Sequence, residues 1–216
     1  MISIVKIIEE TIRNRPKDER RQYIGASQIG HKCDRAIWYA FNGFEKECDS
    51  VKMQKVYDAG RIFENLILDY IIAGGIIVEG IERACEDEEI PMFRGHMDGV
   101  LMLPNQDPIV LELKTSKASS FARFVQHGLM AWAPQYYDQL QSYMGMTGYK
   151  NGVLVAINKD SSELHEEWVK FDEIHYASIK EKVKRIINAS ETPEKINRSP
   201  LFYVCQMCNF RRVCHV

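Results

Sequence analysis

The sequence lacks the features that would place it outside ordinary globular proteins. It has no internal repeat, no low-complexity stretch and no apolar run near the roughly 20 residues that a membrane-spanning helix needs. Lys6, Glu9 and Glu10 interrupt the apolar N-terminal stretch, which argues against a signal peptide. Charge of one sign is also missing, because 28 basic and 30 acidic residues give a formal net charge of -2. We therefore expect a cytoplasmic protein whose overall charge does not by itself indicate a nucleic-acid ligand.

The length of 216 residues is enough for one substantial core and too short for two full domains. Apolar residues at helical spacing predict helices at 2–13, 34–41, 51–73, 119–129, 134–146 and 172–190. Short β-branched or alternating runs predict strands at 75–83, 88–93, 95–103, 108–115, 152–158 and 164–171. This order predicts a single α/β domain over residues 1–216 with a central mixed sheet.

Two of the predicted helices have features that need an explanation. The helix at 2–13 places four apolar residues on one side, namely Ile2, Val5, Ile8 and Ile12. The helix at 51–73 contains Gly60, which costs about 1 kcal/mol relative to alanine. We expect a packing or functional reason for that glycine.

An acidic pair stands out in the middle of the chain. The run IVLELKT is almost wholly apolar, as in a buried strand, yet it contains Glu112 and Lys114. Residues i and i+2 of a strand share a face, so these two side chains project together and Leu113 points the other way. Burying them costs several kcal/mol unless they are paired or bind a metal. A structural Glu–Lys pair on an edge strand is the alternative.

Asp98 favours the metal interpretation. It ends or kinks the strand predicted at 95–103, between Gly95 and Gly99, and the turn LPNQDP would bring it beside Glu112. Two adjacent carboxylates repel unless a cation lies between them, and Mg²⁺ binds carboxylate oxygens while keeping waters for substrate phosphates. Lys114 could then orient or deprotonate the attacking water, or stabilise charge on the phosphate.

These residues resemble the core of the PD-(D/E)XK nuclease superfamily, in which an Asp and a Glu hold one or two divalent metals and the Lys is catalytic. The resemblance implies a restriction-endonuclease-like core with a central mixed sheet flanked by helices. It also implies Mg²⁺ or Mn²⁺ bound by Glu64, Asp98, Glu112 and the carbonyl of Leu113. Glu64 lies in AGRIFENLI, where many bacterial recombination nucleases have a histidine at the position of Phe63. A solvent-facing helix residue is the alternative for Glu64.

Gln139 and Tyr143 are spaced at i and i+4 on a predicted helix. The pair resembles the Q-x-x-x-Y motif of the RecB-like branch of the same superfamily. The resemblance implies that both residues help to position the DNA backbone or the catalytic lysine. From the residues alone, core packing of Tyr143 is the better interpretation.

Half of the six cysteines, Cys205, Cys208 and Cys214, lie within the last twelve residues. In a reducing cytoplasm, metal ligation is a better explanation for them than disulfide formation. A four-thiol site needs one more cysteine, and spacing does not choose among Cys33, Cys48 and Cys85. Zinc and an iron–sulfur cluster are both compatible with four thiolates, and His31 or His215 could replace one of them.

A second resemblance chooses Cys33. Some RecB-like nucleases, including AddB-type and CRISPR-associated exonucleases, hold a [4Fe–4S] cluster with one cysteine before the core and three after it. Their first cysteine lies in a segment similar to S-x-h-x-x-C-x-R-x-x-[WY], where h is apolar. This chain has a comparable arrangement with slightly different spacing: Ser27, Ile29, Cys33, Arg35 and Trp38. The resemblance implies a cluster on Cys33, Cys205, Cys208 and Cys214, with structural Zn²⁺ as the alternative.

The implied organisation is an N-terminal helical segment (1–50), a nuclease core (51–190) and a cysteine tail (191–216) joined to the N-terminal segment by the cluster. The implied function is a Mg²⁺- or Mn²⁺-dependent DNA exonuclease in recombination, repair or CRISPR adaptation, encoded by a phage or by a bacterial or archaeal cell. Its implied partner is DNA, as single strands or duplex ends. The resemblance is also compatible with a recombination or CRISPR adaptation partner protein and with a homo-oligomer. The alternatives are a non-catalytic nucleic-acid-binding or partner-docking module and a zinc-stapled structural protein.

Overall fold

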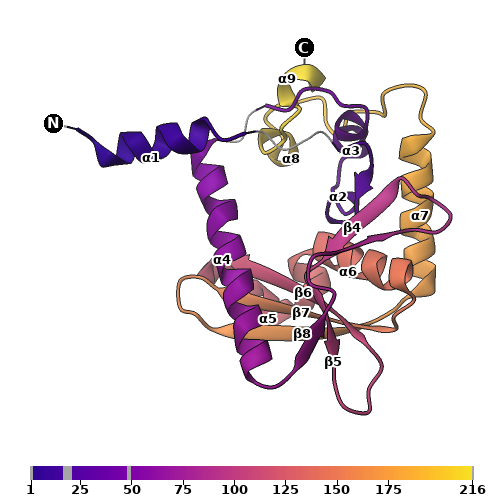
Figure 1. The fold of residues 1–216 in the computed structure, drawn as a ribbon. Helices are drawn as coiled ribbons and strands as arrows, with labels where there is room; N and C mark the ends of the chain where they lie inside the picture. The colour runs from indigo at the N-terminus through magenta and orange to yellow at the C-terminus, as the bar shows by residue number, and fades with distance from the viewer. Residues whose placement is uncertain (1, 17–20, 48–49, 216) are drawn as a thin grey trace.

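A computed structural model describes residues 2–16, 21–47 and 50–215 (Figure 1). Its strands form a three-stranded sheet in the order β1-β4-β3 and a five-stranded sheet in the order β2-β5-β6-β7-β8. The strands are β1 (Ile24–Gly25), β2 (Ile77–Glu79), β3 (Arg83–Glu86), β4 (Phe93–Met97), β5 (Gly99–Met102), β6 (Ile109–Ser116), β7 (Asn151–Asn158) and β8 (Leu164–Lys170).

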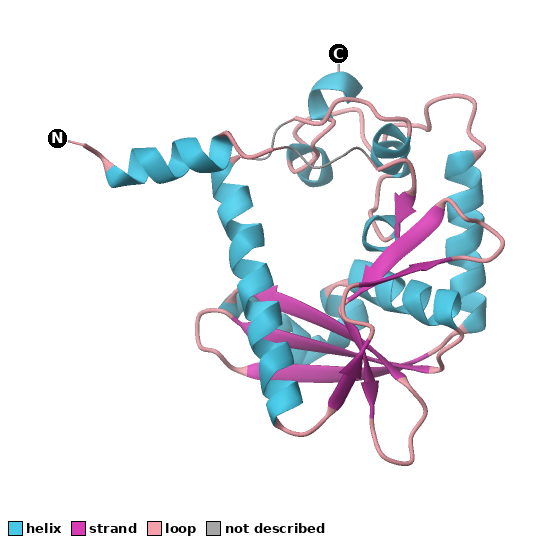
Figure 2. Cartoon of the chain, in the orientation of Figure 1, coloured by secondary structure: helices cyan, strands magenta, loops and turns pink. Residues whose placement is uncertain are grey.

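The helices lie around these sheets (Figure 2). They are α1 (Ile4–Arg13), α2 (Ala26–Ile29), α3 (Asp34–Phe41), α4 (Val51–Ala73), α5 (Ala118–Trp132), α6 (Pro134–Thr147), α7 (Glu173–Ile187), α8 (Tyr203–Gln206) and α9 (Arg211–Cys214). None of the described helices has the length and apolar character needed to cross a membrane.

The five-stranded sheet is mixed, as the sequence predicts. Strands β6 and β7 are parallel, and the other neighbouring pairs are antiparallel. One face, with Leu111 and Leu113, packs against Ile67 and Leu68 of α4, while the other contacts α5 and α6. The α/β prediction is confirmed, with strands in two sheets rather than one. The strand expected at 88–93 is wrong, because only Phe93 of that run belongs to a strand and the chain turns at Ile90, whose carbonyl accepts from Phe93 N–H at 2.7 Å.

The N-terminal helix extends from the body rather than covering a core (Figure 1). Of the four apolar residues predicted on one side, Ile12 is buried, whereas Ile2, Val5 and Ile8 are exposed. Polar contacts join α1 and the residues after it to the first half of α4, and one of them is the ion pair between Glu9 of α1 and Lys55 of α4 at 3.3 Å. The amphipathic helix is therefore present, but most of its apolar face is not covered by the described part of the chain.

The C-terminal tail lies beside α3 and the residues that follow it (Figure 1). Glu47 N–H donates to the carbonyl of Asn209 at 2.7 Å, and the indole of Trp38 donates to the carbonyl of Ala189 at 3.1 Å. These contacts bring the short helices α8 and α9 to the segment that contains Cys33.

Candidate active site and four-cysteine site

Asp98 lies at the point where the chain leaves one sheet and enters the other. Strand β4 ends at Met97 and β5 begins at Gly99. Close packing requires a glycine at this switch, because a Cβ at Gly99 would lie 2.6 Å from Cγ1 of Val78. Gly99 pairs with Leu111 in the antiparallel ladder between β5 and β6, which brings Asp98 next to the segment that contains Glu112.

The Asp98 carboxylate is held by the backbone of β6. Its Oδ2 atom accepts a hydrogen bond from Leu113 N–H at 2.6 Å. Burial raises the pKa of Asp98, and the nearby charge of Lys114 opposes that shift. The backbone of β6 therefore orients the Asp98 carboxylate, which lies in a poorly hydrated position.

Glu112 and Lys114 project to the same side of β6, as their spacing predicts. Glu112 is 0% exposed and its Oε1 atom forms an ion pair with the Lys114 ammonium. Burial, together with the charge of Asp98, raises the pKa of Glu112 to about 8. Burial lowers the pKa of Lys114, but the carboxylates of Glu112 and Asp98 outweigh that effect, so its pKa lies above the ordinary value. The edge placement in the alternative is wrong, because β6 is the middle strand of its sheet, although the Glu–Lys pair itself is present.

Lys114 has two further contacts. Its Nζ donates to the Leu113 carbonyl at 3.0 Å and lies 5.2 Å from the centroid of the Tyr136 ring. Sequence reasoning missed Tyr136. The signal was its position three residues before Gln139, which places the two side chains on the same face of α6. The aromatic ring thus covers the ammonium from the side of α6.

Glu64, on α4, is close enough to this group to interact with its charges. Burial raises the pKa of the Glu64 carboxyl, Lys114 lowers it, and Asp98 raises it further. The described residues contain no set of three or more His, Cys, Asp and Glu side chains arranged to hold one metal ion. The structure therefore places Glu64, Asp98 and Glu112 in one electrostatic neighbourhood without bringing them to a single point.

The donor set nevertheless fits a divalent cation. Within the described ranges, the buried Oε2 atom of Glu112 has no hydrogen-bond partner. An unsatisfied buried carboxylate oxygen is costly in a protein interior and favourable beside a cation. Mg²⁺ is commonly held by one or two carboxylates together with waters and substrate phosphates, so three converging side chains are not required.

Gln139 and Tyr143 lie on one face of α6 and are both nearly fully buried. Gln139 Nε2 donates to the Tyr143 hydroxyl at 3.0 Å, and that hydroxyl donates to the carbonyl of His96 at 2.7 Å. The ring also packs on Gly95, where a Cβ would lie 2.4 Å from Cε1 of Tyr143. These contacts support β4 just before Asp98. The suggested role in placing the substrate stays a prediction.

The four cysteines chosen by resemblance line one pocket where the C-terminal tail meets the segment that begins α3. They are Cys33, Cys205, Cys208 and Cys214. Phe210 N–H donates to Cys208 Sγ at 3.4 Å. Burial raises the pKa of Cys208, and the neighbouring thiols of Cys33, Cys214 and Cys205 add to the shift although the Phe210 N–H opposes it.

The other candidate thiols do not share this pocket. Cys85, on β3, has its Sγ 3.7 Å from the carbonyl of Gly95 and 3.6 Å from Sδ of Met146. Burial raises its pKa to about 11, as expected of a thiol that serves packing. Cys48 lies outside the described residues. Of the described candidates, Cys33 is the one that accompanies the three tail cysteines.

The pocket also fits a bound inorganic group. His215 lines it, and its buried Nε2 atom has no hydrogen-bond partner in the part of the chain that the structure describes. His31 also lies near the site, where its Nδ1 accepts from Cys33 N–H at 3.1 Å. Four thiols with an unpaired imidazole nitrogen form a donor set suited to a soft metal centre.

Comparison with known families decides the relationship of the chain. A model of the YqaJ-like viral recombinase domain matches residues 17–150, more than half of the sequence. The chain belongs to the YqaJ-like viral recombinase domain family. Every candidate catalytic residue lies inside the matched span, as does Cys33, whereas the three tail cysteines lie beyond it.

This YqaJ-like chain is also similar to CRISPR-associated exonuclease Cas4 of Saccharolobus solfataricus, with 22% identity over 191 residues that cover 85% of this chain and 83% of Cas4. The solved LHK-Exo alkaline exonuclease of Laribacter hongkongensis, in complex with dAMP, has a TM-score of 0.61 and 19% identity, covering 78% of this chain and 87% of that one. A phage-related exonuclease from Haemophilus somnus has a TM-score of 0.53 and 14% identity, covering 82% and 88%. The fold is therefore shared with these nucleases, which agrees with the PD-(D/E)XK resemblance.

Proposed function

We propose that this YqaJ-like protein is a Mg²⁺- or Mn²⁺-dependent DNA exonuclease that hydrolyses phosphodiester bonds at DNA ends in recombination, repair or CRISPR adaptation. One observation carries the proposal. A fully buried glutamate on the middle strand of the sheet is paired with a lysine two residues later, and an aspartate lies beside them at the switch between two sheets. Such an arrangement is costly for packing alone and suited to phosphate chemistry.

The chain's own residues have separate tasks in this proposal. Asp98, Glu112, Glu64 and the Leu113 carbonyl would hold the divalent cation, which polarises the scissile phosphate and makes water a stronger nucleophile when it is bound. Lys114 stays protonated, because its pKa is above the ordinary value, and stabilises negative charge that develops on the attacked phosphate. Gln139 and Tyr143 keep β4 in register beside this group through the His96 carbonyl, and thereby align the backbone of the DNA.

For the second site we propose a structural [4Fe–4S] cluster on Cys33, Cys205, Cys208 and Cys214. All four line one pocket. The order of one cysteine before the core and three after it resembles the iron–sulfur nucleases, and this order favours the cluster over a tetrahedral zinc ion, which four thiolates could also hold. The cluster would join the N-terminal segment (1–50) and the tail (191–216) to the core (51–190) of one nuclease domain.

Digestion of end-labelled linear DNA, single-stranded and duplex, with and without Mg²⁺ or Mn²⁺, tests the proposed activity. We expect metal-dependent release of labelled nucleotides by the parent protein, and loss of that release in Lys114→Ala and Glu112→Ala. Lys170→Ala, an exposed lysine on the edge strand β8, is the matched control and should retain activity.

Three outcomes would contradict the proposal. Activity that survives both active-site substitutions would reject the assigned residues. Degradation of covalently closed circular DNA at the rate of linear DNA would indicate an endonuclease, and binding without cleavage would indicate a non-catalytic module. For the second site, anaerobically purified protein should be brown, with absorbance at about 400 nm. Colourless, zinc-loaded protein would reject the cluster.

A further inference from the structure

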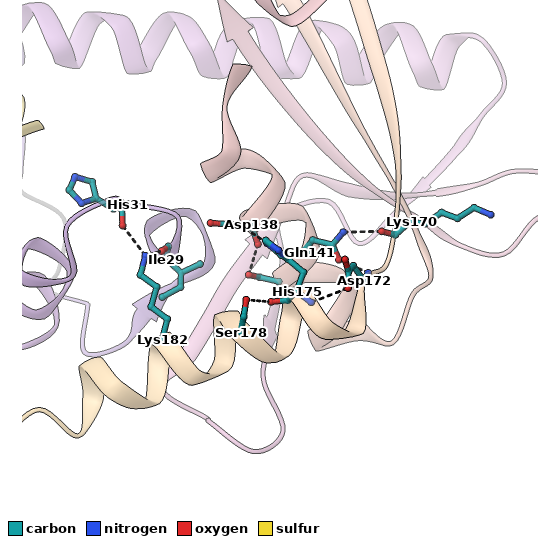
Figure 3. Close-up of polar contacts among 10 residues, drawn as sticks. Ile29, His31, Asp138, Gln141, Lys170, Asp172, His175, Ser178 and Lys182 are labelled. Atoms are coloured by element: carbon teal, nitrogen blue, oxygen red, sulfur yellow. Dashed lines mark hydrogen bonds and ion pairs between the residues drawn. The ribbon is translucent and has the colours of Figure 1, made fainter. Parts of the chain in front are cut away.

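A lysine on α7 reaches across to the segment that contains Cys33. Lys182 Nζ donates to the carbonyl of Ile29 at 2.6 Å and to the carbonyl of His31 at 2.9 Å (Figure 3). The two partners are more than 150 residues away in the sequence. The carbonyl of Ile29 is at the end of the four-residue helix α2, where backbone acceptors lack partners within the helix.

The same contacts extend to the residues on either side of the thiol. Cys33 N–H donates to Nδ1 of His31, one of the residues that Lys182 holds. Asp34 directly follows Cys33, and its carboxylate pairs with Arg185 at 2.7 Å and with Lys182 at 3.6 Å. Helix α7 therefore holds the backbone before Cys33 and the side chain after it.

The other side of the segment is packed against α6. A Cβ at Gly30 would lie 2.4 Å from Cα of Gln135, so the backbone of the segment touches the backbone of that helix. Helix α6 is in turn tied to the start of α7, because Asp138 pairs with His175 at 2.7 Å (Figure 3). The segment before Cys33 is thus held between two helices that are linked to each other.

The position of α7 in the chain gives these contacts a particular consequence. The tail that contains Cys205, Cys208 and Cys214 follows α7, and the Trp38 indole on α3 donates to the carbonyl of Ala189 just after that helix. Helix α7 therefore contacts the Cys33 segment directly and also begins the path to the tail thiols. Together with the direct bonds from Lys32 to Tyr203 and from Glu47 to Asn209, α7 therefore fixes where residues 29–34 lie relative to the tail.

We propose that Lys182 is a positioning residue for the four-cysteine site, holding the backbone before Cys33 so that the Cys33 thiol completes the ligand set of the tail. The inference rests on the proposed cluster and adds a residue outside the ligands to it. Groups that orient metal ligands without binding the metal commonly change metal affinity by about 10–100-fold when they are removed.

The test compares Lys182→Met with Lys184→Met in anaerobically purified full-length protein. Methionine keeps most of the apolar side chain and removes the donor. Lys184 is on the same helix but pairs with the exposed Glu181 and Glu89, so it is a matched control. The measurements are iron per chain and the rate at which absorbance near about 400 nm is lost in excess chelator. We expect loss at least about tenfold faster in Lys182→Met, unchanged loss in Lys184→Met and partial recovery in Lys182→Arg.

Melting of the iron-free proteins distinguishes positioning from general stabilisation. We expect iron-free Lys182→Met and the iron-free parent to melt within a degree or so of each other, with the difference confined to the iron-loaded forms. Equal cluster lifetimes in Lys182→Met and the parent would overturn the inference. So would an equal fall in melting temperature with and without iron.

The failure of the inference is distinguishable from the failure of the proposed activity. Absence of iron from the parent protein would reject the cluster and with it the role of Lys182, whatever the nuclease assay shows. Lys114→Ala should hold the cluster as long as the parent does, because the two sites share no side chain. A parent with stable iron but no nuclease activity would leave the lysine's role supported and reject the proposed enzyme.

Discussion

The two sites of this protein are built in different ways. The acidic site lies on adjoining strands, where the register of β5 with β6 and the alternation of side chains bring Asp98, Glu112 and Lys114 together. In the described part of the chain, none of the four cysteines of the second site lies on a strand. Its four cysteines lie at the start of α3, on the four-residue helices α8 and α9, and, for Cys208, on the segment between those two helices.

The difference shows what each site needs from the rest of the molecule. A pair of residues on the middle strand of a sheet is positioned by the backbone hydrogen bonds that hold the sheet together. In the proposed cysteine site, four residues on short segments depend on individual side chains such as Lys182 and on the metal centre that they would bind together. We therefore expect the acidic site to control chemistry with little effect on stability, and the cysteine site to control stability with an indirect effect on chemistry.

The largest effect should come from Glu112→Gln, which keeps the shape of the side chain and removes its charge. We expect a fall in nuclease rate of at least about a hundredfold, because the substitution removes one preorganised charge from the site. The melting temperature should stay near that of the parent, because Asp98 and the Leu113 carbonyl remain beside the Lys114 ammonium when the desolvated Glu112 carboxylate is replaced by a neutral amide. Digestion of end-labelled DNA and thermal unfolding of the same preparation check both expectations. A variant that melts far below the parent would remove the contrast between the sites.

Cys208→Ala should show the reverse pattern. We expect loss of iron and a melting temperature lower by at least about 5 °C, which for a chain of this size corresponds to roughly 2 kcal/mol. Any loss of activity should follow the loss of folded protein. Cys85→Ala is the matched control, because that thiol contacts Gly95 and Met146 outside the pocket and its removal should leave iron content unchanged. If iron content fell in Cys85→Ala and not in Cys208→Ala, Cys85 would be the ligand and Cys208 the packing residue, contrary to our assignment.

The sequence predicts the acidic site better than the cysteine site, because the first depends on local strand alternation and the second on contacts between distant residues. Local periodicity places α3 and α4 at the observed residues, and strand alternation correctly pairs Glu112 with Lys114. Periodicity does not reveal the division into two sheets, because only Asp98 separates β4 from β5 and residues 95–103 look like one continuous strand. The choice of Cys33 came from resemblance, and the contacts of Lys182 leave no local signal because they join residues about 150 positions apart.

A smaller effect concerns the buried thiol outside the pocket. Burial raises the pKa of Cys85 to about 11 from its ordinary value of 9.0. Its contribution to the free energy of unfolding is therefore fully present below pH 9 and is lost as the pH rises through about 11. At pH 9 we expect alkylation of Cys85 in the folded protein to be at least about tenfold slower than in guanidinium, since the thiolate is the reactive form. Mass spectrometry of the modified peptides measures both rates. Equal rates would show that the Cys85 thiol is accessible and that its pKa is not raised in the folded protein.

The smallest effect should come from Gly60→Ala on α4. Nothing lies within 4 Å of a Cβ built at Gly60, so the packing reason expected from the sequence is wrong for the described residues. Alanine should stabilise the helix by up to about 1 kcal/mol and raise the melting temperature by roughly 2–4 °C. Gly60 precedes Glu64 by one helical turn, so an activity assay on the same variant asks whether DNA approaches this face of α4. A lower melting temperature would contradict the open space around this residue.

One measurement on Lys114→Ala tests most directly whether the acidic site controls catalysis and the cysteine site controls stability. Iron content and Mg²⁺-dependent release of nucleotides from end-labelled linear DNA are determined on the same anaerobic sample, beside the parent protein. We predict iron equal to that of the parent and nucleotide release reduced by at least about a hundredfold. Nucleotide release at the parent rate, from protein that holds its full iron, would contradict the assignment of the reaction to the Asp98, Glu112 and Lys114 site.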